Sequence, residues 1–189
     1  MMTDEQLAGL AGYVLDGDHQ AFERLYNETI GNVYRTLYML TGSPRDAEDV
    51  AQEVYLELYR NIRKYDGSRS FRNWMYGIVV RQHSSFKRKR WREFRKEQKE
   101  RERHSNEAVA KPVSARSQDA TDDVMDNLDQ LPDKLKQVLV LRYINDLSQQ
   151  DIADALHIPV GTVKSRLSQA LRRMRQMMGR DLHGESFGR

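Results

Sequence analysis

The sequence predicts an all-α protein made of two small helical domains joined by a flexible linker. Apolar residues recur at steps of three and four, as in Val50, Val54, Leu58 and Ile62, which is the period of an amphipathic helix. No segment shows the alternation of a half-buried strand, and from residue 104 to 120 small polar residues replace the helical pattern. We therefore expect a first domain over 1–92, a charged and flexible linker over 93–122, a second domain over 123–178 and a tail over 179–189.

Composition agrees with two small domains and excludes several functions. The 189 residues have a mean hydropathy of −0.80, which is polar for a single large core. Cysteine is absent, so disulfides, thiolate metal sites and cysteine nucleophiles are excluded. No stretch approaches the ~18 apolar residues of a membrane span, and the acidic N-terminus is unlike a secretory signal. We expect a cytoplasmic protein without membrane insertion.

The net charge of +3 is the sum of blocks with opposite signs. Residues 1–59 carry −8 and residues 60–103 carry +11. Residues 104–135 and 136–160 carry −4 and −1, whereas residues 161–189 carry +5. Two separate basic blocks predict two places where a polyanion could bind, and the acidic blocks predict surfaces that face another partner.

The helices of the first domain begin at recognisable capping residues. Asp18 precedes one helix, and Ser43 precedes the next, which has a proline at its first position. In the amphipathic helix over 46–60, Asp49, Gln52 and Glu53 lie together on the polar side. Such a face is more often solvated than functional, and no nearby histidine or glycine loop would complete a catalytic site.

The next segment, 64–92, mixes cations with aromatic rings. Residues 65–68 form a turn in which glycine supplies backbone freedom, and Ser70 caps a helix that continues through Phe71, Trp74 and Ile78. Phe71 and Trp74 are expected in the core. Cations can hold a phosphate backbone and aromatic faces can hold unstacked bases, so this segment predicts binding to single strands or junctions.

Residues 131–178 predict a helix–turn–helix with a supporting helix. Its first helix begins at Pro132 and its second follows Ser148, with His157 in the turn before a third helix over about 161–177. A plain three-helix bundle with a solvated face is the alternative, but residues 161–179 contain no acid, which favours nucleic acid. The polar face of the third helix carries hydroxyls, an amide and cations suited to a major groove: Thr162, Lys164, Ser165, Ser168, Gln169 and Arg172.

Taken in this order, the segments resemble the bacterial RNA polymerase sigma factors, in particular the extracytoplasmic-function (ECF) group. Residues 46–60 are similar to the region-two helix with which this family grips the polymerase clamp. Residues 69–90 are similar to the segment that opens and reads the promoter minus-ten element, and residues 131–175 to region four, which reads the minus-thirty-five element. The resemblance implies a region-two helical bundle followed by a region-four helix–turn–helix.

The resemblance also implies roles for individual residues. Asp49, Gln52 and Glu53 would bind core polymerase, and the six polar-face residues of the last helix would contact minus-thirty-five DNA. The loop over 65–70 would trap a flipped base of the non-template strand. The family often has asparagine at the position of Arg81 and a basic residue at the position of Gln169. Both positions touch promoter DNA in the family, so the resemblance does not fix the DNA sequence that this chain favours there. Minus-ten DNA would be contacted by Tyr65, Asp66, Gly67, Ser68, Arg69, Ser70, Trp74, Arg81, Lys87 and Arg88.

The implied function is to bind core RNA polymerase through its clamp and flap regions, direct it to promoters and promote strand opening. The implied partners include promoter DNA, both duplex and single-stranded, and an anti-sigma factor, common in the family, that could hold the protein at the membrane. No catalytic residue, cofactor or metal is expected.

Two other functions compete with this one. A stand-alone helix–turn–helix regulator would explain residues 131–178 but leaves the aromatic and basic segment unexplained. An enzyme acting on nucleic acid would need a metal or nucleophile cluster. The chain does not favour such a cluster, because its histidines are scattered: His19, His83, His104, His157 and His183.

Overall fold

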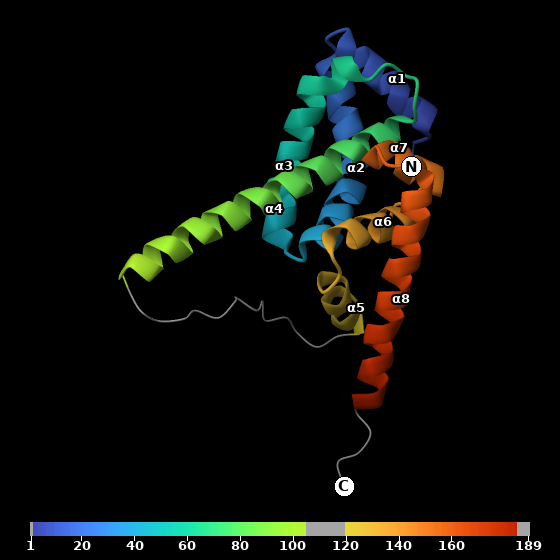
Figure 1. The fold of residues 1–189 in the computed structure, drawn as a ribbon. Helices are drawn as coiled ribbons and strands as arrows, with labels where there is room; N and C mark the ends of the chain where they lie inside the picture. The colour runs from blue at the N-terminus through green and yellow to red at the C-terminus, as the bar shows by residue number, and fades with distance from the viewer. Residues whose placement is uncertain (1, 105–119, 185–189) are drawn as a thin grey trace.

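The computed structural model describes residues 2–104 and 120–184, and within them the regular elements are helices (Figure 1). This confirms the prediction of an all-α protein. Four α-helices and a short 3-10 helix form the first half: α1 (Asp4–Leu15), α2 (His19–Thr41), α3 (Pro44–Asn61), η1 (Ile62–Lys64) and α4 (Phe71–His104). The second half contains α5 (Ala120–Asp129), α6 (Asp133–Tyr143), α7 (Gln149–Leu156) and α8 (Val160–Gly184).

The predicted helix starts are confirmed. The Asp18 carboxylate accepts hydrogen bonds from the backbone N–H groups of Gln20 and Ala21 at 2.8 and 3.1 Å. The Ser43 hydroxyl accepts from the N–H of Asp46 at 3.3 Å. Ser148 and Asp151 form a reciprocal capping box at the start of α7. These side chains satisfy N–H groups that a helix leaves unpaired in its first turn.

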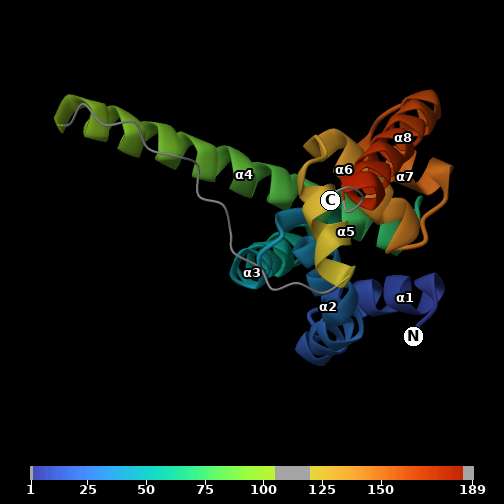
Figure 2. The same ribbon diagram turned by 90° about the horizontal axis from the view of Figure 1, so that it is seen from below.

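Helices extend into both ends of the predicted linker. Helix α4 continues through residues 93–104, the charged first part of that linker, and it projects away from the other helices (Figures 1 and 2). Arginine, lysine, glutamate and glutamine are good helix formers, so this charged stretch extends the helix without a core. Helix α5 likewise begins at Ala120, and α8 runs to Gly184. The rest of the predicted linker, 105–119, lies outside the described residues.

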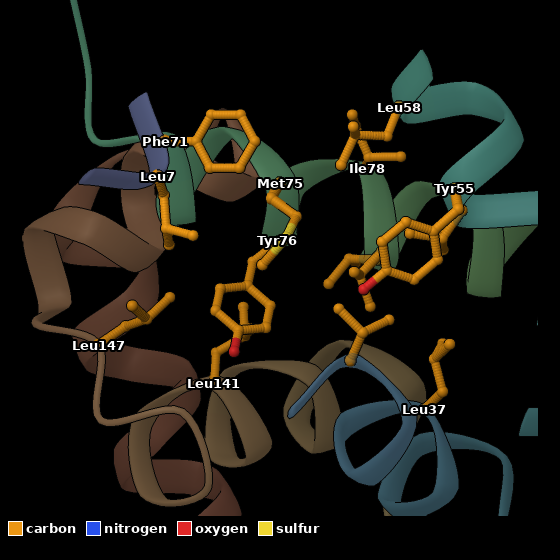
Figure 3. Close-up of a cluster of buried hydrophobic side chains, with 14 of the residues drawn as sticks. Leu7, Leu37, Tyr55, Leu58, Phe71, Met75, Tyr76, Ile78, Leu141 and Leu147 are labelled. Carbon is orange, nitrogen blue, oxygen red and sulfur yellow. The ribbon is translucent and has the colours of Figure 1, made fainter. Parts of the chain in front are cut away.

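The first core lies between α1, α2, α3 and the first half of α4 (Figure 3). Leu37 and Leu58 are fully buried, as is Phe71, which was expected in the core. The buried Tyr55 hydroxyl forms a hydrogen bond of 2.8 Å with that of Thr29. Burial raises the pKa of Tyr55 well above its usual value, because the phenolate would lose its hydration.

The helix–turn–helix packs directly on this bundle. Leu141 and Leu147 belong to the same apolar cluster as the first core (Figure 3). Between the halves, the Asn145 amide donates to the hydroxyls of Thr36 and Tyr76 at 2.7 and 2.9 Å. The two halves therefore share apolar and polar contacts in the described structure.

The beginning of α4 is held from both halves. The Asp4 carboxylate accepts hydrogen bonds from the Ser70 hydroxyl and from the N–H groups of Phe71 and Arg72 at 2.9, 3.0 and 2.9 Å. The Asn73 amide donates to the Asp151 carboxylate of α7 at 2.6 Å. Burial opposes ionisation of Asp151, but hydrogen bonds from Ser148 and Asn73 outweigh it and lower its pKa. Both carboxylates thus fix where α4 starts.

His83 of α4 is a buried polar residue without an obvious partner. Its exposed fraction is 0%, and neither ring nitrogen forms a hydrogen bond within the described residues. It lines a cavity together with Leu40 and Lys136. Burial lowers the pKa of His83 to about 4; Asp133 opposes the shift, while Lys87 and Lys136 add to it. The folded chain therefore holds this imidazole neutral.

We expect His83 to make stability depend on pH. The unfolded chain binds a proton at this residue near pH 6.5, whereas the folded chain does so only near pH 4. Stability is thus lost as pH falls, and between pH 7 and 5 this group should lower the free energy of unfolding by about 2 kcal/mol. Urea denaturation at both pH values should show a smaller loss for His83→Leu than for the wild type. An equal loss in both would contradict the prediction, and exposed His19→Gln is the control.

Candidate protein and nucleic-acid interfaces

The exposed side of α3 carries the three residues predicted to bind polymerase. Asp49, Gln52 and Glu53 are all exposed and lie on one face of the helix. The same face continues with Leu56 and Tyr59, whose exposed fractions are 50% and 47%. Sequence reasoning missed these two apolar residues, although they follow Asp49 and Gln52 at helical spacing on the side away from the core.

Aromatic contacts between α2 and α3 support this face. Phe22 packs edge-on against Tyr59 with ring centroids 5.0 Å apart, and Tyr26 packs against Tyr55 at 4.6 Å. Tyr26 itself is 39% exposed. An apolar centre of tyrosine and leucine bordered by carboxylates is typical of protein–protein interfaces, where aromatic anchors contribute most of the affinity. We call this surface, Asp49, Gln52, Glu53, Leu56 and Tyr59, the α3 face.

The turn over residues 65–70 is closed by its own side chains. The Asp66 carboxylate accepts hydrogen bonds from the N–H and hydroxyl of Ser68 at 3.0 and 2.6 Å, and these bonds lower its pKa. Gly67 has a φ of 73°, which glycine adopts at no steric cost. The Tyr65 hydroxyl donates to the Arg69 carbonyl at 2.9 Å. The turn is therefore a preformed loop with Asp66, Gly67, Ser68 and Arg69 on the surface.

An aromatic cluster lies behind this loop. The Tyr65 ring lies 5.2 Å from that of Phe71 and 5.4 Å from that of Trp74, measured between centroids. Phe71 is fully buried, whereas Tyr65 and Trp74 are half-buried. Of the two residues expected in the core, only Phe71 is completely enclosed. Tyr65 and Trp74 keep partial surface beside the loop, as base stacking would require.

Further along α4, the predicted minus-ten residues meet the second half of the chain. Exposed Arg81 borders an open groove of about 440 Å³, whose other side includes His157 and Arg166. The pKa of Arg81 is lowered, mainly because partial burial disfavours the charged guanidinium. Lys87 forms an ion pair with Asp133 at the start of α6, and Arg88 donates to the Ser85 hydroxyl at 3.0 Å. Of the residues predicted to contact minus-ten DNA, those in the 65–70 loop are at the surface, whereas Arg81 and Lys87 lie beside the second half of the chain.

Helix α7 approaches α4 closely because Gly77 has no side chain. A Cβ at Gly77 would lie 2.8 Å from the carbonyl oxygen of Ala155. The helix–turn–helix therefore covers part of α4 at the level of Gly77 and Arg81, whereas the loop over 65–70 stays at the surface.

The predicted reading helix, α8, has the expected two faces. Val163, Leu167 and Met174 are buried, whereas five of the six predicted contacts are exposed and Thr162 is half-buried. His157 ends α7 in the left-handed region with a φ of 53°, so its role in the turn is structural. A row of hydroxyls, amide and cations on an exposed helix can contact base edges and phosphates.

Residues 2–104 and 120–184 hold no group of three or more histidines and carboxylates that could bind a metal ion. Among the helices described, none is both long and apolar enough to cross a membrane.

Comparison with known proteins finds the same two modules. The family model for Sigma-70 region 2 matches residues 25–93, and that for Sigma-70 region 4 matches residues 121–174. Two solved structures share the fold: the sigma factor RpoE with the anti-sigma factor NepR from Bartonella quintana, and CnrH with the cytosolic domain of CnrY. The first has a TM-score of 0.67 at 20% identity, covering 84% of this chain and 96% of that one. The second has a TM-score of 0.66 at 19% identity, covering 94% and 97%.

Curated relatives match over nearly their whole length. The chain is 31% identical over 177 residues to the ECF RNA polymerase sigma factor SigW of Bacillus subtilis, covering 89% of this chain and 94% of that one. It is 30% identical over 179 residues to the ECF RNA polymerase sigma-E factor of Haemophilus influenzae, covering 89% and 92%. With both regions in order and this coverage, the chain belongs to the ECF RNA polymerase sigma factors.

Proposed function

We propose that this sigma factor divides its work among three surfaces: the α3 face for core polymerase, the 65–70 loop with α4 for minus-ten DNA, and α8 for minus-thirty-five DNA. Its membership of the family makes it a factor that directs RNA polymerase to promoters. The observation that supports the division is that both regions occur in order, with the α3 face and the 65–70 loop exposed in the first and the polar side of α8 exposed in the second. The factor itself catalyses no reaction and acts in the cytoplasm.

The α3 face suits the polymerase clamp because it combines charge with apolar anchors. Asp49 and Glu53 attract cationic side chains, and Leu56 with Tyr59 supplies apolar area that a partner would bury. A solvated helix needs no exposed tyrosine and leucine in the middle of its polar side.

The minus-ten surface combines a rigid loop with cations. Trapping a flipped base costs a few kcal/mol of unstacking, which contacts inside a preformed pocket can offset. The Asp66–Ser68 hydrogen bonds order the loop beforehand, so binding loses less conformational entropy. Trp74 and Tyr65 offer partial ring surface next to it, and Arg81, Lys87 and Arg88 lie along the same helix for phosphates.

The two DNA-reading modules must separate on a promoter. Elements named for positions −10 and −35 lie about 25 base pairs apart, or about 85 Å of B-DNA at 3.4 Å per base pair. Helix α7 contacts α4 at Gly77, and the 25 residues of α8 span only about 37 Å. We therefore propose that the packed arrangement opens when the factor engages polymerase and promoter.

An anti-sigma factor is proposed as a further partner. The support is that the sigma factor RpoE, which shares this fold, was solved in complex with the anti-sigma factor NepR. CnrH, which also shares the fold, was solved with a partner as well, the cytosolic domain of CnrY. A membrane-bound factor of this kind would hold the chain at the membrane. A stand-alone helix–turn–helix regulator is less favoured, because it gives the α3 face and the 65–70 loop no role.

In vitro transcription tests the proposed function directly. Full-length chain added to core RNA polymerase over a promoter library should stimulate initiation from a subset of templates that share two sequence elements. Sequencing of the transcripts identifies that subset. If no template responds while a known sigma factor works with the same core, the proposal is wrong.

The α3 face is tested by Asp49→Arg. A cation here should repel the partner surface that the carboxylate attracts, so affinity for core polymerase should fall more than about tenfold. Fluorescence titration of labelled chain with core measures this, and circular dichroism should show unchanged helix content. Glu28→Arg makes the same charge change at an exposed residue of α2 outside the α3 face. Normal core affinity in Asp49→Arg would exclude this face as the contact.

The reading helix is tested by Gln169→Ala. Glutamine can bond both exposed edge atoms of an adenine, so its loss should relax discrimination at one base pair of the minus-thirty-five element by roughly 5- to 150-fold. Transcript sequencing from a library randomised in that element measures the preference. Gln176→Ala, at an exposed position two turns further along α8, is the matched control and should leave every preference intact. An unchanged pattern in Gln169→Ala would remove this residue from the reading surface.

A further inference from the structure

We infer that the projecting part of α4 is a second DNA-binding element, which holds the backbone of duplex DNA next to the minus-ten element. Its contact surface is a row of cations that we call the α4 stripe: Arg88, Arg92, Arg95, Lys96 and Lys99. The inference rests on the proposed function, because it requires α4 to lie along promoter DNA.

Five cations of the projecting helix share one side of it. At 100° per residue, the five stripe residues fall within a sector of about 100°. Glu93, Glu97 and Glu100 fall together in a neighbouring sector. Oppositely charged residues three or four positions apart on a helix can form ion pairs, and Lys96 has Glu93 and Glu100 at these spacings. Arg88, Arg92 and Arg95 have no carboxylate three or four residues away, so these three arginines carry the inference.

The stripe lies on a helix that leaves the body of the protein (Figures 1 and 2). All side chains from Lys87 to Glu100 are exposed. By contrast, two cations outside the stripe are neutralised by the protein: Lys87 pairs with Asp133, and Arg90 pairs with Asp46. In the described residues, no such ion pair to a carboxylate is found for Arg88, Arg92 or Arg95.

Two stripe arginines are held in place by the helix itself. The Arg95 guanidinium stacks over the Trp91 ring, 3.7 Å from its centroid. The Arg92 Nε donates to the Arg88 carbonyl at 3.3 Å. Because Trp91 is 55% exposed, its packing role here gives a reason for a large ring at the surface. Held arginines lose less side-chain entropy when they bind phosphate.

The partner is inferred from charge, spacing and continuity. From Arg88 to Lys99 the stripe covers about 17 Å of helix axis at 1.5 Å per residue, and duplex DNA carries a negative charge every ≈1.7 Å. The stripe also continues the sector of α4 that contains Arg81, one of the predicted minus-ten contacts. Arginine and lysine without accompanying amides or carboxylates suit phosphates, so the stripe adds affinity without reading sequence.

The test uses holoenzyme made from core polymerase and full-length chain, on a labelled promoter fragment recovered by the transcription screen. Arg92→Gln/Lys99→Gln removes two stripe cations, and Arg24→Gln/Arg35→Gln removes two exposed cations of α2 as the matched control. Losing two phosphate contacts should reduce the slope of log affinity against log salt by about 1.8. Between 50 and 200 mM salt the stripe variant should therefore lose about tenfold less affinity than the wild type. The control should match the wild type.

Two further arms separate the outcomes. On a fragment whose flanking duplex is trimmed to the minus-ten element, wild type and stripe variant should bind alike. An unchanged salt slope on the full fragment overturns the inference, and so does a loss of core affinity in the variant, which would assign the stripe to polymerase. Failure of the proposed function gives a different result, because the wild-type holoenzyme would then bind no promoter fragment. That result would overturn the proposed function and the stripe inference together.

Discussion

The start of α4 depends on a carboxylate near the N-terminus, in helix α1. Asp4 accepts three hydrogen bonds from Ser70, Phe71 and Arg72, 66 to 68 positions later. A helix start leaves N–H groups that must find partners, and a side-chain cap contributes about 1 kcal/mol. Because α1 is itself packed in the core, it fixes the direction of α4 and with it the Tyr65–Trp74 cluster and the loop. Together with the Asn73–Asp151 hydrogen bond, this contact sets the position of the proposed minus-ten surface.

The contacts between the two halves combine a shared apolar cluster with polar contacts. Several are hydrogen bonds, such as those of Asn145 with Thr36 and Tyr76, which water can replace. The Lys87–Asp133 ion pair is about half exposed on both sides, and such pairs contribute little stability. Interfaces between domains of one chain are usually more polar than permanent ones. Lys87 is at once an ion-pair partner in the packed form and a proposed phosphate contact in the open form.

Periodicity and capping rules predicted most of the local structure. Asp18, Ser43, Ser70 and Ser148 start helices as expected, because these bonds join residues two to four positions apart. What could not be predicted depends on distant residues or on exposure. The Asp4 cap and the packing of α7 on Gly77 join segments far apart in sequence. Leu56 and Tyr59 were missed for a different reason: their spacing from Asp49 and Gln52 places them on the exposed side of α3, but apolar residues were expected in the core.

Asp151 uses its two oxygens for different tasks. One, Oδ1, accepts from the Asn73 amide of α4, and the other, Oδ2, accepts from the N–H of Ser148 within its own module. Undocking from α4 would leave the second bond and the α7 cap intact. If the halves separate as proposed, the helix–turn–helix keeps this cap and would need no refolding before it meets DNA. With this arrangement, separating the two halves would cost the free energy of the contacts between them and would leave the α7 cap unchanged.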